Sequence, residues 1–230
     1  MANTDKKILV WDAPVRVFHW LMVLSFAGAW LTAESERSRL IHVTLGYTLG
    51  GLVAFRILWG LVGTRYARFT EFVRGPAAIR GYLTHMLRLA GHVFAPRADS
   101  ARQQAGAVHT AQPEHHVGHN PAGAVAIVLL LLSSVLIVAT GWATYNDIGG
   151  NWIAELHEGA SSFMLALVFV HVAGVALASW LHRENLVRAM LDGKKDGVAH
   201  QGIRRSWSVL AVIMLLAVIG FWWLQWRGAA

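Results

Sequence analysis

Five long apolar runs divide the 230-residue chain, and charged or polar stretches separate them. A helix needs about 20 predominantly apolar residues to cross the hydrocarbon core of a bilayer, and each run reaches or approaches that length. The pattern predicts an all-α integral membrane helical bundle, formed by one membrane domain over residues 1–230. Its transmembrane helices are expected at about 17–33, 40–62, 121–145, 152–182 and 207–226.

The longest polar stretch, 63–120, has two parts. Apolar residues recur at helical spacing in 76–90, which indicates an amphipathic helix on the membrane surface. An ordinary soluble helix would show the same pattern. Residues 95–116 are polar, small and aperiodic, so we expect them to be disordered. Their three histidines could bind a metal ion, although a solvated linker explains them more simply.

Composition agrees with a polytopic membrane protein, because 55% of the residues are hydrophobic and only 14% are charged. The net charge of +7 is distributed unevenly along the chain. Three of the 20 lysines and arginines precede the first run, eight lie from Arg56 to Arg102 and six from Arg183 to Arg205. The positive-inside rule then places the N-terminus and both long loops in the cytoplasm and the C-terminus in the periplasm. No groove-reading motif accompanies these charges, so we expect the lipid bilayer and not nucleic acid as the partner.

The chain contains no cysteine, which excludes disulfides, cysteine-ligated iron–sulfur clusters and covalently attached haem. Any haem must be held non-covalently. The first residues lack a signal-peptide cleavage pattern, so we expect the first span to be retained.

Four histidines fall inside the apolar runs. His157 and His171 share one face of the run 152–182, because fourteen residues are nearly four helical turns, and their depths differ by about 21 Å. His19 is level with His171 near the cytoplasmic surface, and His42 is level with His157 near the periplasmic surface. Ionisable residues at such depths are expensive and indicate function.

The depths predict two separate pairs, His19 with His171 and His42 with His157. One zinc ion cannot bind all four rings, because its ligands must lie about 2 Å from it. Two imidazoles on facing helices suit the axial positions of a haem iron. Gly46 leaves space near His42, in line with Gly50, and Gly174 does so near His171. The open alternative is a non-redox membrane module, a proton-relay or transport subunit, in which these histidines relay protons or make structural hydrogen bonds.

Four polar residues are further candidates. Arg16 and Arg56 could bind haem propionates through charge-assisted hydrogen bonds, or could extend to lipid phosphates. His119 and Asn120 precede the run 121–145 and could hydrogen-bond a quinone carbonyl. For Asn120 we favour a helix cap, because Pro121 follows it.

Several motifs resemble the bacterial cytochrome b561 family, and most closely the b-type cytochrome subunits of nickel–iron hydrogenases. They are VWDAPVRVFHW, GYTLGGLVAFRILWGLVG, GHNPAG and LHEGASSFMLALVFVHVAG, and the resemblance covers roughly residues 10–191. It implies a four-helix core with two haem b groups, for which the matching ligands are His19, His42, His157 and His171. The segment 95–116 is longer than is usual in that family.

The resemblance also implies electron transfer in the bacterial inner membrane. A quinone would exchange electrons with a periplasmic c-type cytochrome or hydrogenase through the two haems, as part of a respiratory chain. No second catalytic apparatus is visible, so quinone oxidoreductase chemistry is expected only as part of this transfer. A stand-alone superoxide:quinone oxidoreductase is an alternative within the family, and a homodimer is compatible with the sequence.

Overall fold

The computed structural model describes residues 6–72, 80, 84, 117–119 and 121–229. Five of its helices are long and apolar enough to cross a membrane, which confirms the predicted membrane helical bundle. They are α1 (Ala13–Thr32), α2 (Arg39–Val62), α5 (Pro121–Tyr145), α6 (Asn151–His182) and α8 (Ser208–Ala229). The expected amphipathic helix and the expected disordered segment lie outside the described residues, apart from Arg80 and Thr84.

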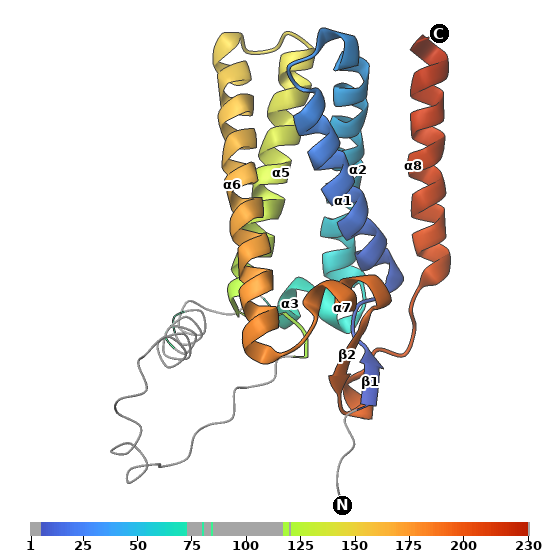
Figure 1. Ribbon diagram of the computed structural model, residues 1–230. Helices are drawn as coiled ribbons and strands as arrows, with labels where there is room; N and C mark the ends of the chain where they lie inside the picture. Colours follow the sequence, from blue (N-terminus) through green and yellow to red (C-terminus); the bar gives the residue numbers. More distant parts are fainter. Residues whose placement is uncertain (1–5, 73–79, 81–83, 85–116, 120, 230) are drawn as a thin grey trace, which may run out of the picture.

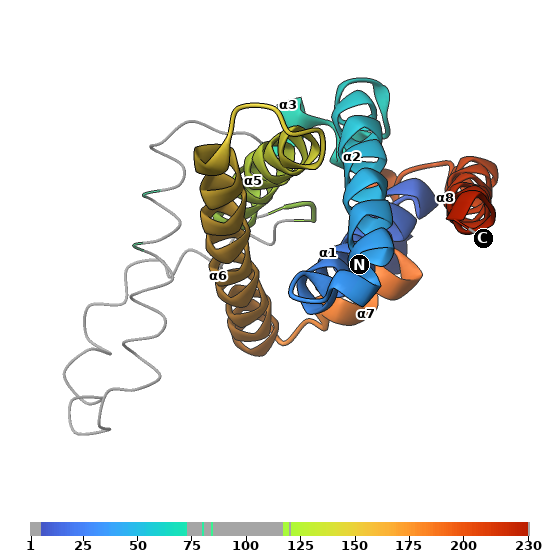
Figure 2. The same ribbon diagram turned by 90° about the horizontal axis from the view of Figure 1, so that it is seen from above.

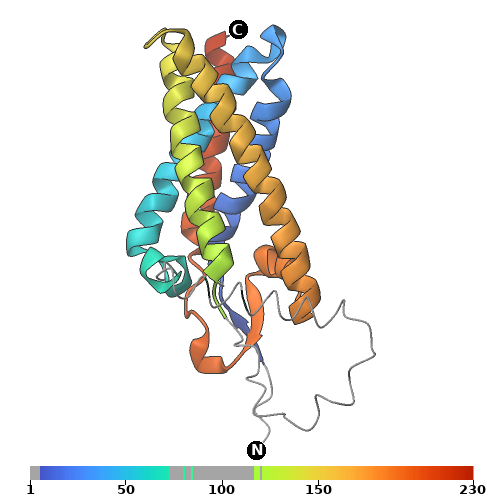
Figure 3. The same cartoon turned by 90° about the vertical axis from the view of Figure 1, so that its left-hand side faces the viewer.

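Four of these helices form a bundle, and α8 stands outside it (Figures 1 and 2). Helix α1 packs along α2, α2 along α5 and α5 along α6, while α8 contacts α1 and α2. Figure 3 shows that α5 and α6 are adjacent at the top and diverge toward the bottom. We call the bottom, which carries α3, α7, β1 and β2, the sheet end. The opposite end, with the connections 33–38 and 146–150, is the loop end.

The sheet end contains two strands that the apolar pattern did not predict. Strand β1 (Lys6–Leu9) pairs antiparallel with β2 (Lys194–Gly197), with Lys6 opposite Gly197. Four-residue strands of sequence KKIL and KKDG carry too little alternation to be recognised as strands. The same end holds the short helices α3 (Phe69–Phe72) and α7 (Leu186–Asp192). Its 3-10 turns are η2 (Arg65–Ala67) and η5 (Ala199–Gln201), whereas η1 (Glu36–Ser38) lies at the loop end.

Helix α1 begins four residues before the apolar run that predicted it. Asp12 precedes it in extended conformation and accepts a hydrogen bond from Val15 N at 2.8 Å. Such a cap satisfies one of the backbone donors that a helix leaves free at its start, and Pro14 needs no donor there. The polar cap, rather than the first apolar residue, therefore sets where α1 begins.

A buried apolar layer crosses the middle of the four-helix bundle. It includes residues from α1, α2, α5 and α6, namely Phe26, Leu49, Ile137, Ala160 and Met164. Met164 lies seven residues from both His157 and His171. The layer therefore fills the bundle between the two depths at which the histidines lie.

Helix α8 is joined to the bundle by apolar contacts of Leu210 and Met214 and by a side-chain hydrogen bond within the apolar zone. Trp222 Nε1 donates to Thr48 Oγ1 on α2 at 2.8 Å, and that hydroxyl donates to Thr44 O at 2.8 Å. None of the four predicted histidines lies on α8. The fifth span is thus peripheral to them.

Candidate functional site

Two of the predicted histidines face each other at the loop end. The rings of His42 on α2 and His157 on α6 have centroids 6.2 Å apart and planes at 82°. Two imidazoles that bind one metal ion from opposite sides have centroids about 6 Å apart, because each metal–nitrogen bond is about 2 Å long. The pair has the spacing that two axial ligands of one ion require.

Both rings are oriented by hydrogen bonds at the Nδ1 atom. His42 Nδ1 lies 2.8 Å from Ala29 O, and His157 Nδ1 lies 3.0 Å from Ile137 O and 3.2 Å from Thr140 Oγ1. A backbone carbonyl only accepts, so each Nδ1 carries the proton and donates it. The Nε2 atom of each ring then keeps a free lone pair, as a metal ligand needs.

Glycines leave room around this pair. A Cβ atom on Gly141 would lie 2.8 Å from Cε1 of His157, so α5 and α6 approach closely only because residue 141 has no side chain. A Cβ atom on Gly46 or Gly159 would meet nothing within 4 Å. One glycine therefore lets the His157 ring lie against α5, and two others leave the helix surface near the pair uncovered.

The second pair lies toward the sheet end. His19 is on α1, and His171 on α6 lies within electrostatic range of it. The His19 ring meets Trp20 edge to face at 5.1 Å, and its Nδ1 atom is buried without a hydrogen-bond partner. A Cβ atom on Gly174, one turn beyond His171, would again meet nothing within 4 Å. A buried nitrogen without a partner fits a ligand position, although the His19 ring is less firmly oriented than those of His42 and His157.

The two pairs are separate sites. At 1.5 Å per residue, the fourteen residues from His157 to His171 span about 21 Å of α6. Within the described ranges, no three histidine, aspartate or glutamate side chains gather as a metal-binding group. The structure thus places His42 beside His157 toward the loop end, and His19 within electrostatic range of His171 toward the sheet end.

Arg56 lies inside the protein at the sheet end of α2. Its side chain is only 3% exposed, and its guanidinium donates to Ala67 O at 3.0 Å. The guanidinium also lies 4.9 Å from the Phe69 ring centroid and 5.9 Å from that of Phe72. These contacts hold the charge in the protein interior and not at the lipid headgroups.

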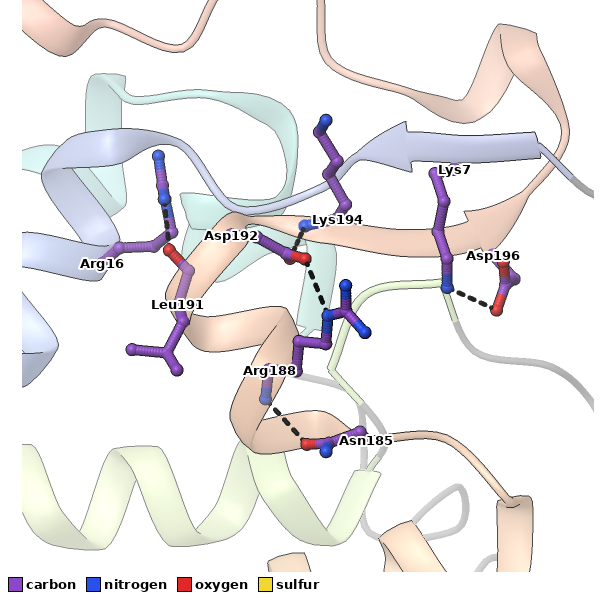
Figure 4. A network of polar contacts seen from close by, with 8 residues as sticks. All are labelled: Lys7, Arg16, Asn185, Arg188, Leu191, Asp192, Lys194 and Asp196. Carbon is purple, nitrogen blue, oxygen red and sulfur yellow. Dashed lines mark hydrogen bonds and ion pairs between the residues drawn. The ribbon is translucent and has the colours of Figure 1, made fainter.

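Arg16 reaches from α1 to the end of α7 (Figure 4). Its Nη1 donates to Leu191 O at 2.6 Å, while its buried Nε atom has no hydrogen-bond partner. Figure 4 also shows two ion pairs. Arg188 pairs with Asp192 within α7, and Lys7 of β1 pairs with Asp196 of β2. Arg16 thus lies one turn before His19 with one donor still free.

His119 lies between two aromatic rings. Its ring centroid is 4.5 Å from that of Trp11 and 4.5 Å from that of Phe72. Removal from water, with the charges of Arg56 and Lys195 nearby, lowers the pKa of His119 to about 3. It is therefore neutral at physiological pH, and a ring nitrogen can donate or accept a hydrogen bond. Asn120, the other quinone candidate, lies outside the described residues.

Asp12 is a buried residue that the sequence did not single out. It is fully buried, and besides capping α1 it accepts hydrogen bonds from Trp59 Nε1 at 3.0 Å and Thr64 Oγ1 at 2.5 Å. An aspartate directly before Ala-Pro at a helix start is a recognisable cap signal. The bonds to Trp59 and Thr64 carried no such signal, because both residues are about 50 positions away.

A second buried charge at this end is Lys195 on β2. It is 4% exposed and pairs with Glu184 at 3.2 Å. The buried charged side chains Asp12, Arg56 and Lys195 at the sheet end thus each have a hydrogen-bond or ion-pair partner.

Comparison with known proteins gives one family match and several relatives. Residues 10–193 match the family described as prokaryotic cytochrome b561. A protein of Cupriavidus necator named "Probable Ni/Fe-hydrogenase B-type cytochrome subunit" is 25% identical over 227 residues, covering 82% of this chain and 86% of the relative. A relative of that name from Rhizobium leguminosarum bv. viciae is 22% identical, over 83% of this chain and 89% of its own length.

A third relative, from Escherichia coli K12, is named "Probable Ni/Fe-hydrogenase 1 B-type cytochrome subunit". It is 28% identical over 157 residues, which cover 60% of each chain. No solved structure matches the chain.

Proposed function

Because this chain belongs to the prokaryotic cytochrome b561 family, we propose that it is a di-haem b-type cytochrome that carries electrons across a bacterial inner membrane. It would link a membrane quinone to a redox protein on the periplasmic side. The observation that carries this proposal is the facing of His42 and His157 at 6.2 Å, with both Nδ1 atoms hydrogen-bonded.

The proposed ligands are one histidine pair for each haem. His42 and His157 would hold the haem at the loop end, and His19 and His171 the haem at the sheet end. A haem supplies one-electron redox chemistry when it is bound. A layer of buried apolar residues around Met164 lies between the two sites. Electrons could therefore cross the bundle without a polar path for protons through that layer.

The sheet end is the proposed cytoplasmic side, on the strength of the positive-inside rule. Among the described residues, Arg37, Arg39 and Arg227 lie toward the loop end. The elements of the sheet end carry more cations, namely Lys6, Lys7, Arg65, Arg188, Lys194 and Lys195. The first described residue would then lie in the cytoplasm and α8 would end in the periplasm.

Arg16 and Arg56 are the proposed propionate partners at the sheet end. Arg16 has a free buried Nε donor one turn from His19, and Arg56 is enclosed instead of extending to lipid. His119 and Asn120 remain the proposed quinone contacts. A neutral His119 could donate or accept one hydrogen bond through its ring edge.

The proposed periplasmic partner is a hydrogenase or a c-type cytochrome. The names of the relatives from Cupriavidus necator and Escherichia coli support a hydrogenase. An outward-facing pair at His42 and His157 would be the nearer of the two sites for such a partner.

The first experiment is a haem count on the purified protein. We expect two b haems per chain from a pyridine haemochrome assay, and a reduced-minus-oxidised spectrum typical of six-coordinate haem. His42→Ala should remove the loop-end haem and keep the other, and His19→Ala should do the reverse, since each removes one of two iron ligands.

His200→Ala is the matched control, because His200 is exposed and belongs to neither pair. It should retain both haems. A folded wild-type chain that holds no haem after expression with haem supplied would overturn the proposed function. Loss of both haems from either folded single variant would overturn the pairing.

A further inference from the structure

We propose that Thr140 is a positioning residue that lowers the reduction potential of the loop-end site, so that the potential rises from the loop end to the sheet end. This inference rests on the proposed function, in which each histidine pair holds one haem. Electrons that enter at the loop end would then move inward across the membrane with favourable free energy.

The hydroxyl group of Thr140 is held so that it can only accept from His157. It has one proton, which it donates to Leu136 O at 2.8 Å on its own helix. Its lone pairs are then available to His157 Nδ1 at 3.2 Å. The Nδ1–H group of His157 is thereby shared between Thr140 and the carbonyl of Ile137 at 3.0 Å.

Such hydrogen bonds act on the metal through the ring. Donation from Nδ1–H raises the electron density at Nε2 and makes the imidazole a stronger base. A stronger base stabilises the more highly charged, oxidised iron, so the reduction potential falls. His42 contributes in the same direction, because its Nδ1 atom lies 2.8 Å from Ala29 O.

The sheet-end pair lacks this feature at His19. The Nδ1 atom of His19 is buried without a hydrogen-bond partner. The His19 imidazole is therefore a weaker base than the two imidazoles at the loop end. The sheet-end haem is expected to have the higher potential of the two.

The charged side chains at the sheet end do not by themselves decide which haem has the higher potential. The two buried cations there each lie near a carboxylate, Arg56 near Asp12 and Lys195 paired with Glu184 at 3.2 Å. The positive charge of Arg16 would raise the sheet-end potential further, because it opposes the oxidised iron. The hydrogen-bond contrast remains the main cause.

The test is a potentiometric titration of the purified holoprotein, in which the absorption of reduced haem is followed against the applied potential. We expect two components in the wild type. The single haem that remains in His19→Ala should titrate at the lower potential, and the one that remains in His42→Ala at the higher. The reverse assignment, or equal potentials, would overturn the inference.

Variants of Thr140 test the residue itself. Thr140→Val removes the hydroxyl at nearly constant volume and should shift only the lower component upward, whereas Thr140→Ser keeps the hydroxyl and should restore the wild-type potential. Ser134→Ala is the matched control, because its hydroxyl also bonds the carbonyl four residues earlier, at 2.7 Å, but touches no histidine.

Three results would overturn the role of Thr140. They are a shift in the potential of both components in Thr140→Val, a downward shift of the lower potential in that variant, or an equal shift in Ser134→Ala. If Thr140→Val does not fold, the two single-haem potentials still decide the order. A wild-type chain without haem would overturn the proposed function, whereas two haems with the wrong order would overturn this inference alone.

Discussion

At the scale of single residues, the two histidine pairs differ in how their rings are held. His42 and His157 each donate to a carbonyl of a neighbouring helix, whereas His19 has a buried nitrogen without a partner. Bound iron would fix the Nε2 side of all four rings. Only at the loop end does the protein also fix the other side, so that site is the more preorganised.

His119 makes the stability of the protein depend on pH. Its pKa is lowered to about 3 in the folded state, by removal from water, from about 6.5 in the unfolded chain. Below pH 6.5 the unfolded chain therefore binds a proton that the folded chain does not, and the stability contribution falls as the pH decreases toward 3. The slope approaches about 1.4 kcal/mol per pH unit.

We expect the melting temperature of the wild type to fall between pH 7 and pH 4 more steeply than that of His119→Gln. Circular dichroism in detergent measures this directly. The exposed residue His200 provides the control, since His200→Gln should keep the wild-type slope. Identical slopes in all three proteins would show that His119 does not carry the effect.

At the scale of helices and strands, the five spans could be predicted and the sheet end could not. An apolar run of membrane-spanning length has few alternatives, so the helices α2, α5 and α6 begin within one residue of their expected positions. Strands β1 and β2 are short, and their pairing joins residues almost 190 positions apart. Pattern along the chain does not encode such a partner.

The candidate site could likewise be predicted only in part. Spacing along α6 predicted that His157 and His171 share a face, and depth predicted that His42 meets His157. The backbone carbonyls that accept hydrogen bonds from these rings could not be predicted. Every residue has a carbonyl group, and nothing in the sequence distinguishes that of Ala29 from the others. The role of Thr140 could not be predicted either, because several residues of this apolar helix carry a hydroxyl group. Only the structure shows that the hydroxyl of Thr140 contacts His157 on α6.

Asp12 connects the start of α1 to Trp59 on α2 and to Thr64. Variants of Asp12 therefore measure how much these contacts contribute to the stability of the protein. Asp12→Ala removes the cap of α1 and leaves Trp59 Nε1 and the Thr64 hydroxyl without their acceptor. We expect a loss of about 2–4 kcal/mol in the free energy of unfolding, because buried donors would lose their partner. Denaturant titration in detergent would measure it.

Asp12→Asn keeps one acceptor oxygen and should lose less. The control is Asp196→Ala, which breaks an exposed ion pair with Lys7 and should leave stability almost unchanged. Equal losses for Asp12→Ala and Asp196→Ala would contradict the role assigned to the buried carboxylate.

At the scale of the whole molecule, the two ends of the bundle have different characters. The sheet end gathers the buried charged side chains of the described residues, Asp12, Arg56 and Lys195, on a base of short elements. The loop end consists of two short connections above the His42–His157 pair. A protein partner would therefore meet a small surface at the loop end and a larger, more polar one at the sheet end.

The absence of cysteine allows the orientation to be measured by single-cysteine labelling. Asp147→Cys lies at the loop end and His200→Cys at the sheet end. In intact cells a membrane-impermeant maleimide should label Asp147→Cys, and should label His200→Cys only after the inner membrane is permeabilised. The opposite result would reverse the proposed orientation.

The pairing of β1 with β2 also bears on how the protein is made. Lys6 and Gly197 become neighbours only after the ribosome has synthesised the first four membrane spans and the segment beyond them. The strands can meet only if the start of α1 and the end of α6 emerge on the same side of the membrane. A chain in which one of the first four spans had failed to insert could not form this pair. The smallest sheet in the molecule thus acts as a late check on topology, before the last span is inserted beside the completed bundle.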